Sequence, residues 1–189
     1  MMPRRGVALL ILVAEGSQRI GQRQSLPVRE RSLIRRAVET GVASACRPII
    51  VVAEAHAEIV GDELQLLPVV IACNQKSASG VGSLLRVAME ALAAFDDIEG
   101  TVIMLFDQPL VTADALNRIV EAHYMTGKDI VASEYEDAYG EPLYIGKRFF
   151  GEIASLGGGR AARRIVDRHL EHVTTVSLAD AAFDVDAPE

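Results

Sequence analysis

Short, uninterrupted runs of apolar residues recur along this chain, and they restrict its fold more than any other feature. They are VALLILVA (7–14), PIIVVA (48–53), VVIA (69–72), TVIMLF (101–106), DIVAS (129–133) and HVTTVS (172–177). A run of this length is typical of a strand that is buried on both faces, as in a parallel sheet. We therefore expect each run to form a strand of one sheet.

Helical periodicity fills the intervals between these runs. The clearest pattern repeats at i, i+3, i+4 and i+7 and comprises Val81, Leu84, Leu85, Ala88, Leu92 and Phe95. A second pattern, around Leu116 and Ile119, follows Thr112, a residue type suited to cap a helix. Further helices are expected near residues 30–45 and around Ile165. This alternation predicts one α/β domain over residues 1–189, with a mostly parallel sheet and helices on both faces.

Charge and composition exclude several classes of function. The formal net charge is −7, whereas nonspecific nucleic-acid binding requires a basic surface. Cys46 and Cys73 are the only cysteines, which is too few for a zinc site or a disulfide framework. Arg4 and Arg5 precede the first apolar run, but no small-x-small cleavage site follows it, so we expect a buried strand there. No stretch is long enough to span a membrane, and we expect a cytoplasmic protein.

Sheets of this kind bind ligands at the carboxyl ends of their strands, so the segment after the first run is a candidate site. It reads E-G-S-Q-R-I-G-Q-R (15–23). Glycines let backbone N–H groups approach phosphate, while Ser17, Arg19 and Arg23 add a hydroxyl donor and positive charge. Neither the Lys-Ser/Thr of a Walker A loop nor the G-x-G-x-x-G of a dinucleotide site is present. These residues alone leave a phosphate-binding loop and an ordinary glycine-rich turn equally open.

A second candidate is N-Q-K-S-A-S-G-V-G-S (74–83), between the third run and the clearest helix. Gly80, Gly82 and Ser83 lie near the start of that helix. Unpaired N–H groups and the helix dipole favour an anion or a carbonyl-rich base at such a position. The alternative is that a serine of this segment only caps the helix.

A third candidate is Asp107, which directly follows the TVIMLF run. A carboxylate at the end of a buried strand is costly unless it is exposed or bound to a cation. Magnesium takes one or two carboxylates together with substrate phosphates. Asp184 or Asp186, near the end of the chain, could complete such a site. The alternatives are a turn-forming Asp-x-Pro and a solvated acidic tail.

Taken in order, these segments resemble the MobA-like nucleotidyltransferases, which are the molybdenum-cofactor cytidylyltransferases and guanylyltransferases and their relatives. The resemblance covers nearly the whole chain and rests on short motifs. They are L-V-A-E-G-S-Q-R-I-G (12–21), N-Q-K-S-A-S-G-V-G-S-L (74–84), L-F-D-Q-P-L-V-T (105–112), G-E-P (140–142), R-A-A-R (160–163) and D-V-D-A-P-E (184–189). The L-F-D-Q-P-L-V-T motif is the most specific match, and its D-Q-P-L-V-T form together with the G-x-G-S-L form of residues 80–84 favours the cytidylyl branch over the guanylyl one.

The resemblance implies a nucleotide-diphospho-sugar-transferase-like, Rossmann-type fold and a definite reaction. Molybdopterin phosphate, a pterin-type acceptor, would attack the α-phosphorus of CTP or GTP and release pyrophosphate. Magnesium would be held by Asp107 and Asp186, and Arg19 and Asp107 would be catalytic. The implied nucleotide-binding residues are Ala14, Glu15, Gly16, Ser17, Arg23, Asn74, Gly80, Gly82 and Ser83. The implied acceptor-side residues are Gly140, Glu141, Pro142 and Arg160.

Four departures from the family pattern keep other functions open. Glu15 replaces a loop glycine, the loop lysine is absent, Glu141 replaces a histidine, and Gly159 stands where the family has an aspartate. A non-catalytic relative that binds a nucleotide, a pterin or a partner molybdoenzyme is the main alternative. A dinucleotide-dependent oxidoreductase is a further one, with Glu54 as a ribose ligand, although the glycine pattern disfavours it.

Overall fold

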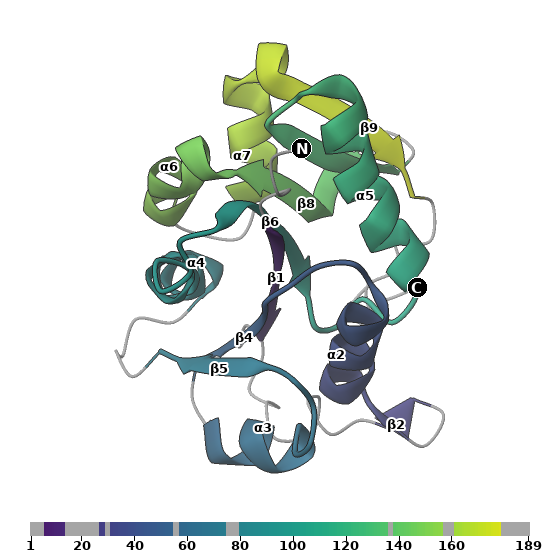
Figure 1. Ribbon diagram of the computed structural model, residues 1–189, viewed down its shortest axis with the longest axis vertical. Helices are drawn as coiled ribbons and strands as arrows, with labels where there is room; N and C mark the ends of the chain where they lie inside the picture. Colours follow the sequence, from purple (N-terminus) through teal and green to yellow (C-terminus); the bar gives the residue numbers. More distant parts are fainter. Residues whose placement is uncertain are drawn as a thin grey trace.

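A seven-stranded sheet forms the centre of the protein (Figure 1). The computed structural model describes residues 6–13, 27–28, 31–54, 57–74, 80–135, 138–156 and 161–178. The strands run in the order β5-β4-β1-β6-β8-β7-β9. Their bounds are β1 Gly6–Val13, β4 Ile49–Ala53, β5 Val70–Cys73, β6 Ile98–Leu105, β7 Ile130–Tyr135, β8 Ala138–Gly146 and β9 Val173–Ser177. A separate antiparallel pair joins β2 (Pro27–Val28) to β3 (Arg31–Ser32).

The sheet is mostly parallel, as the apolar runs predicted. β1 pairs in parallel with both β4 and β6, β4 with β5, and β7 with β9. β8 alone is reversed, and it pairs antiparallel with β6 on one side and β7 on the other. The predicted strand runs all form strands, with ends that shift by up to a few residues. The sequence patterns did not predict β8.

Helices cover both faces of the sheet, which confirms the second part of the fold prediction (Figure 1). They are α2 Leu33–Ala43, α3 Ala57–Glu63, α4 Val81–Leu92, α5 Ala113–Thr126, α6 Phe150–Ser155 and α7 Ala161–Arg168, with short 3-10 helices at Lys147–Phe149 and Leu170–His172. One buried cluster joins alternate residues of β1, β4 and β6 to α2 and α5. The other joins the remaining residues of these strands to α4, α6 and α7.

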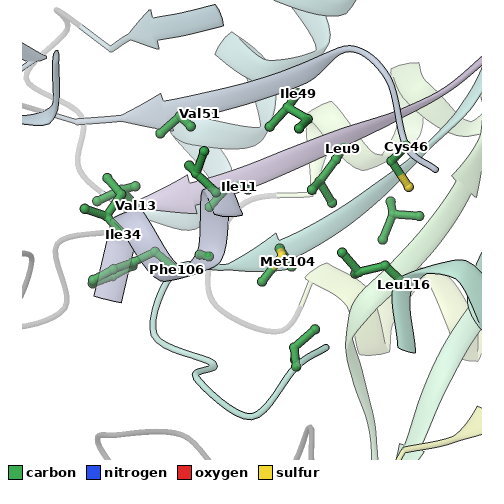
Figure 2. Close-up of a cluster of buried hydrophobic side chains, with 14 of the residues drawn as sticks. Leu9, Ile11, Val13, Ile34, Cys46, Ile49, Val51, Met104, Phe106 and Leu116 are labelled. Atoms are coloured by element: carbon green, nitrogen blue, oxygen red, sulfur yellow. The ribbon is translucent and has the colours of Figure 1, made fainter. Parts of the chain in front are cut away.

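Alternation along β1 explains why one strand serves both clusters. Leu9, Ile11 and Val13 point to the α2 side, where Figure 2 shows them beside side chains from β4, α2 and β6. Leu10 and Leu12 point to the α4 side. Every residue from Ala8 to Val13 is fully buried, so the core itself positions the carboxyl end of this strand.

Local signals in the sequence set the ends of the helices. Ser32 Oγ accepts a hydrogen bond from Arg35 N at 3.2 Å at the start of α2. The predicted cap Thr112 does the same for Ala115 N at 3.2 Å at the start of α5. Gly127 ends α5 with a φ of 67°, in the left-handed region that glycine favours. Within the described ranges, no helix combines the length and the apolar character required to cross a membrane.

Candidate active site

The carboxyl edge of the sheet gathers the ends of the central strands. In the register, Val13 of β1 pairs with Ala53 of β4, which in turn pairs with Cys73 of β5. Leu12 of β1 pairs with Leu105 of β6. Polar residues follow three of these strand ends directly or after one more residue: Glu54 after β4, Asn74 after β5 and Asp107 after β6.

β8 reaches this same edge from the opposite direction. Because it is antiparallel to β6 and its Leu143 pairs with Ile103, residues 140–142 lie beside the end of β6. Gly140, Glu141 and Pro142, which the resemblance assigned to the acceptor, are therefore on the same edge as Asp107.

Asp107 lies in a turn that its neighbours hold firmly. Gln108 is buried, and its Oε1 accepts a hydrogen bond from Leu105 N at 3.2 Å. Its Nε2 donates to the Glu141 carbonyl at 3.0 Å, which links the turn to β8. Arg36 of α2 donates from Nε to the Pro109 carbonyl at 2.9 Å. The Asp107 side chain is half-buried, with its Oδ1 shielded from solvent, so this carboxylate has a fixed place at the edge.

The main chain of Glu141 is held from a second side. The Tyr135 hydroxyl donates to the Glu141 carbonyl at 2.8 Å, so that one carbonyl accepts from both Tyr135 and Gln108. Burial first, and then the nearby Glu141 carboxylate, raise the pKa of Tyr135, which stays a neutral donor. A Cβ on Gly140 would lie 2.3 Å from the Tyr135 hydroxyl oxygen. Glycine is thus required at position 140 for this contact to form.

A hydrogen-bond chain connects the end of β5 to the start of α4. Asn74 Nδ2 donates to Ser83 Oγ at 2.9 Å, and Ser83 Oγ donates to the Gly80 carbonyl at 2.9 Å. Gly80 has a φ of 109°, which favours glycine, and its N–H donates to a carboxylate oxygen of Glu54. Asn74, Gly80 and Ser83, which sequence reasoning assigned to the nucleotide, therefore form one connected unit with Glu54.

Several predicted site residues lie outside the described ranges. They are Ala14, Glu15, Gly16, Ser17, Arg19 and Arg23 of the first loop, together with Arg160 and Asp186. β1 ends at Val13 on the carboxyl edge, directly before residues 14–23 in the chain. Among the described residues, no group of three or more His, Cys, Asp or Glu side chains could hold a metal.

The sequence patterns do not assign three residues of this edge to the site. Gln108 is part of a motif but has no predicted role, and Tyr135 belongs to no motif, although both donate hydrogen bonds to the Glu141 carbonyl. Glu54 was considered only as a ribose ligand. The available signal was position, because Glu54 follows its strand as directly as Asn74 follows its own.

Comparison with known protein families agrees with the sheet and the carboxyl edge described above. The family model of the MobA-like NTP transferase domain matches residues 9–173. The chain belongs to the MobA-like NTP transferase family. The match begins within β1 and ends at the first residue of β9, so it includes β4, β5, β6, β7 and β8 entirely.

Two proteins resemble this MobA-like chain over nearly its whole length. It is 26% identical over 190 residues to nicotine blue oxidoreductase of Paenarthrobacter nicotinovorans, covering 95% of this chain and 92% of the relative. The crystal structure of the Rv0371c homologue from Mycobacterium sp. strain JC1 is 27% identical, has a TM-score of 0.84 and covers 97% of this chain and 92% of that one.

A more distant structure shows the fold alone. The CMP:2-keto-3-deoxy-manno-octonic acid synthetase complexed with CTP is 9% identical, with a TM-score of 0.72 and coverage of 97% of this chain and 94% of that one. The MobA-like chain thus has the fold of the nucleotide-diphospho-sugar transferases, as the resemblance implied.

Proposed function

We propose that this protein is a nucleotidyltransferase that transfers CMP, or GMP, from the nucleoside triphosphate to the phosphate of a pterin-type acceptor such as molybdopterin. The observation that carries the proposal is the position of Asp107 at the carboxyl edge, next to both the end of β1 and residues 140–142 of β8. The hydrogen bond from Gln108 to the Glu141 carbonyl holds the turn that contains Asp107 against β8. One carboxylate thus lies between the segments that we assign to the nucleotide and those that we assign to the acceptor.

The donor chemistry of this edge fits a magnesium ion. Magnesium prefers oxygen ligands and uses one or two carboxylates together with phosphate oxygens. Asp107 would hold it, with Asp186 as the second carboxylate. When bound, magnesium supplies positive charge that offsets the charge of the phosphates.

The reaction needs positioning more than a protein nucleophile. A phosphate oxygen of the acceptor forms a bond to the α-phosphorus, the bond from that phosphorus to the bridging oxygen breaks, and pyrophosphate leaves with the electron pair. Ser17, Arg19 and Arg23 would hold the triphosphate, and the Asn74–Ser83 unit would hold the base and ribose. Gly140, Glu141, Pro142 and Arg160 would orient the acceptor for in-line attack.

Calorimetric titration with CTP and GTP, with and without magnesium, tests the proposal directly. We expect the wild type to bind one of them more tightly when magnesium is present. Asp107→Asn keeps the shape of the side chain and removes its charge, so it should abolish the magnesium-dependent gain, a loss of about tenfold or more.

Asp97→Asn is the matched control, because Asp97 is exposed and precedes β6 at the opposite end of the same strand. It should leave both titrations unchanged. Thermal unfolding of the two variants should stay close to that of the wild type. If Asp107→Asn unfolds readily and the wild type shows no response to magnesium, Asp107 is a structural residue and the proposal is wrong.

The relative named nicotine blue oxidoreductase favours a second candidate function, since it matches 95% of this chain. That function would be electron transfer between nicotine blue and a nicotinamide dinucleotide. Consumption of NADH or NADPH in the presence of nicotine blue, unaffected by CTP and magnesium, would support it.

A non-catalytic role would show instead as nucleotide or pterin binding without release of pyrophosphate.

A further inference from the structure

β8 carries a bulge at the carboxyl edge of the sheet. Consecutive residues of β7 pair with Leu143 and then with Gly140 of β8. Glu141 and Pro142, which lie between these two, are therefore opposite no residue of β7. Bulges are over-represented beside active sites, where they redirect a segment that a regular strand would keep in the ladder. This bulge falls within the segment that we assign to the acceptor.

Side chains satisfy the main chain of the bulge where the ladder does not. Ser133, which is fully buried, donates from Oγ to the Pro142 carbonyl at 2.5 Å. The Glu141 carbonyl accepts from the Tyr135 hydroxyl at 2.8 Å and from Gln108 Nε2 at 3.0 Å. A carbonyl oxygen has two lone pairs, and two donors from different parts of the chain use them here. These two donors therefore determine how the bulge is oriented.

Gln108 also joins the end of β6 to the bulge. Continued past its last pair, the register between β6 and β8 would set Leu105 directly opposite Glu141. The Gln108 amide lies between them instead, because its Oε1 accepts from Leu105 N at 3.2 Å and its Nε2 donates to the Glu141 carbonyl. The two main chains are thus held apart by one amide group, in the same turn as Asp107.

We propose that Tyr135 is a positioning residue for the acceptor, and that it acts together with Gln108 through the Glu141 carbonyl. This inference rests on the proposed nucleotidyltransferase function. Gln108 belongs to the turn of Asp107, so it sets where the bulge lies relative to the nucleotide. Tyr135 keeps the bulge from turning away from that position. The acceptor contacts the bulge, and its phosphate is thereby presented to the α-phosphorus of the nucleotide.

Tyr135→Phe removes the hydroxyl and keeps the ring. Without this donor the bulge occupies other positions for part of the time, and the affinity for the acceptor falls with the fraction that stays correctly placed. By calorimetric titration, we expect the variant to bind molybdopterin about fivefold more weakly than the wild type, which corresponds to the net loss of one hydrogen bond. The affinity for CTP or GTP with magnesium should change less than about twofold, because the turn of Asp107 keeps its own hydrogen bonds.

Tyr139→Phe is the matched control, because Tyr139 is exposed and lies in the same strand as the bulge. It should bind both ligands like the wild type. In turnover, Tyr135→Phe should raise the KM for molybdopterin and leave the KM for the nucleotide unchanged. A residue that only stabilises the fold would not separate the two substrates in this way.

Gly140→Ala disturbs the same contact by another route. A Cβ at position 140 would lie 2.3 Å from the Tyr135 hydroxyl oxygen and 3.3 Å from the ring carbon that bears it. The methyl group should displace the hydroxyl and weaken molybdopterin binding by a similar factor of about five. In the Tyr135→Phe background little is left to displace, so adding Gly140→Ala should cost less than about a further twofold. Fully additive losses would show that the hydroxyl does not act through the bulge, which overturns the inference.

The remaining outcomes separate this inference from the proposed function. If the wild type binds both ligands and Tyr135→Phe binds molybdopterin equally tightly, the role of Tyr135 is overturned and the proposed function stands. Equal weakening of both ligands in Tyr135→Phe also overturns it, because the hydroxyl then supports the whole edge. If the wild type binds the nucleotide but no molybdopterin, the inference fails with the acceptor half of the proposed function, and the nucleotide half stands. If it binds neither, both proposals fail together.

Discussion

Gly100 in β6 lies against the ring of Tyr144 in the neighbouring strand β8. A Cβ at this position would stand 2.3 Å from the Tyr144 hydroxyl oxygen and 2.5 Å from two ring carbons. Tyr144 is fully buried, so its ring has no room to move. We therefore expect Gly100→Ala to lower the free energy of unfolding by about 2 kcal/mol or more.

Urea denaturation measures this change, and Gly61→Ala is its control. Gly61 is within α3, and a Cβ there would meet nothing within 4 Å. Alanine favours a helix over glycine, so that variant should gain roughly 0.5 to 1 kcal/mol. Equal stability of the two variants would mean that β8 can shift away from β6.

The hydroxyl of Tyr144 itself is an unusual feature of this core. It is buried, and it has no hydrogen-bond partner among the described residues. Burial is also the main reason that the pKa of Tyr144 is raised. A buried hydroxyl without a partner costs about 1 to 3 kcal/mol relative to one that is satisfied.

Tyr144→Phe removes this hydroxyl and keeps the ring, which stacks on His123 with centroids 4.2 Å apart. We expect the free energy of unfolding to stay constant or to rise by about 1 kcal/mol. Chemical denaturation at neutral pH measures it. A decrease of more than about 1 kcal/mol would show that the hydroxyl makes a stabilising hydrogen bond in solution.

At the scale of elements, Glu152 ties α6 to the end of α7. Its Oε2 lies 2.7 Å from His169 Nε2, and its Oε1 accepts from Arg168 at 3.2 Å. The hydrogen bond from His169 is the largest cause of a lowered pKa at Glu152, whose ordinary value is 4.5. A carboxylate whose pKa is lowered by folding stabilises the protein above its ordinary pKa and loses this contribution as the pH falls through the lowered value.

We therefore expect Glu152→Gln to flatten the loss of stability on acidification. Between about pH 5 and pH 3, the free energy of unfolding of the wild type should fall more steeply than that of the variant. Denaturation curves at several pH values measure both slopes. Glu121→Gln, which removes an exposed carboxylate on α5, should keep the slope of the wild type, and an equally unchanged slope for Glu152→Gln would contradict the expectation.

The strands that could be predicted from the sequence are those whose own residues determine their burial. β1 and β6 are apolar throughout most of their length, and no other element suits such a segment as well. β8 escaped because Gly140 and Pro142 lie within it, and both residues ordinarily interrupt strands. Its extended form depends on pairing with β6 and β7 on either side, which no local pattern reports.

The same distinction applies to the candidate site, where one residue could be located from the sequence and some contacts could not. The position of Asp107 follows from the rule that ligands bind at the carboxyl ends of strands, so sequence reasoning could locate it. The contact between Glu54 and Gly80 could not be anticipated, because it depends on the distance between a side chain and the start of a helix elsewhere in the chain. The hydrogen bond from Gln108 Nε2 to the Glu141 carbonyl likewise depends on the reversed direction of β8, which the sequence patterns did not predict.

At the scale of the whole molecule, β8 divides the sheet into two unequal parts. β5, β4, β1 and β6 form one parallel group, and β7 and β9 form another. The larger group carries the ends that we assign to the nucleotide, while β8 supplies the residues that we assign to the acceptor. Under the proposed function, this single reversed strand would let two substrates be held at one edge by segments that are distant in sequence.

The central place of β1 also has a consequence for synthesis of the chain. Leu9 pairs with Ile49 on one side and with Val102 on the other. A ribosome that adds about 5 to 20 residues per second makes Val102 roughly 5 to 20 seconds after Leu9. Until then one side of a wholly apolar strand has no partner, so the nascent chain exposes a segment that chaperones bind readily. This protein should accordingly depend on such assistance during translation more than a protein whose first strand lies at the edge of its sheet.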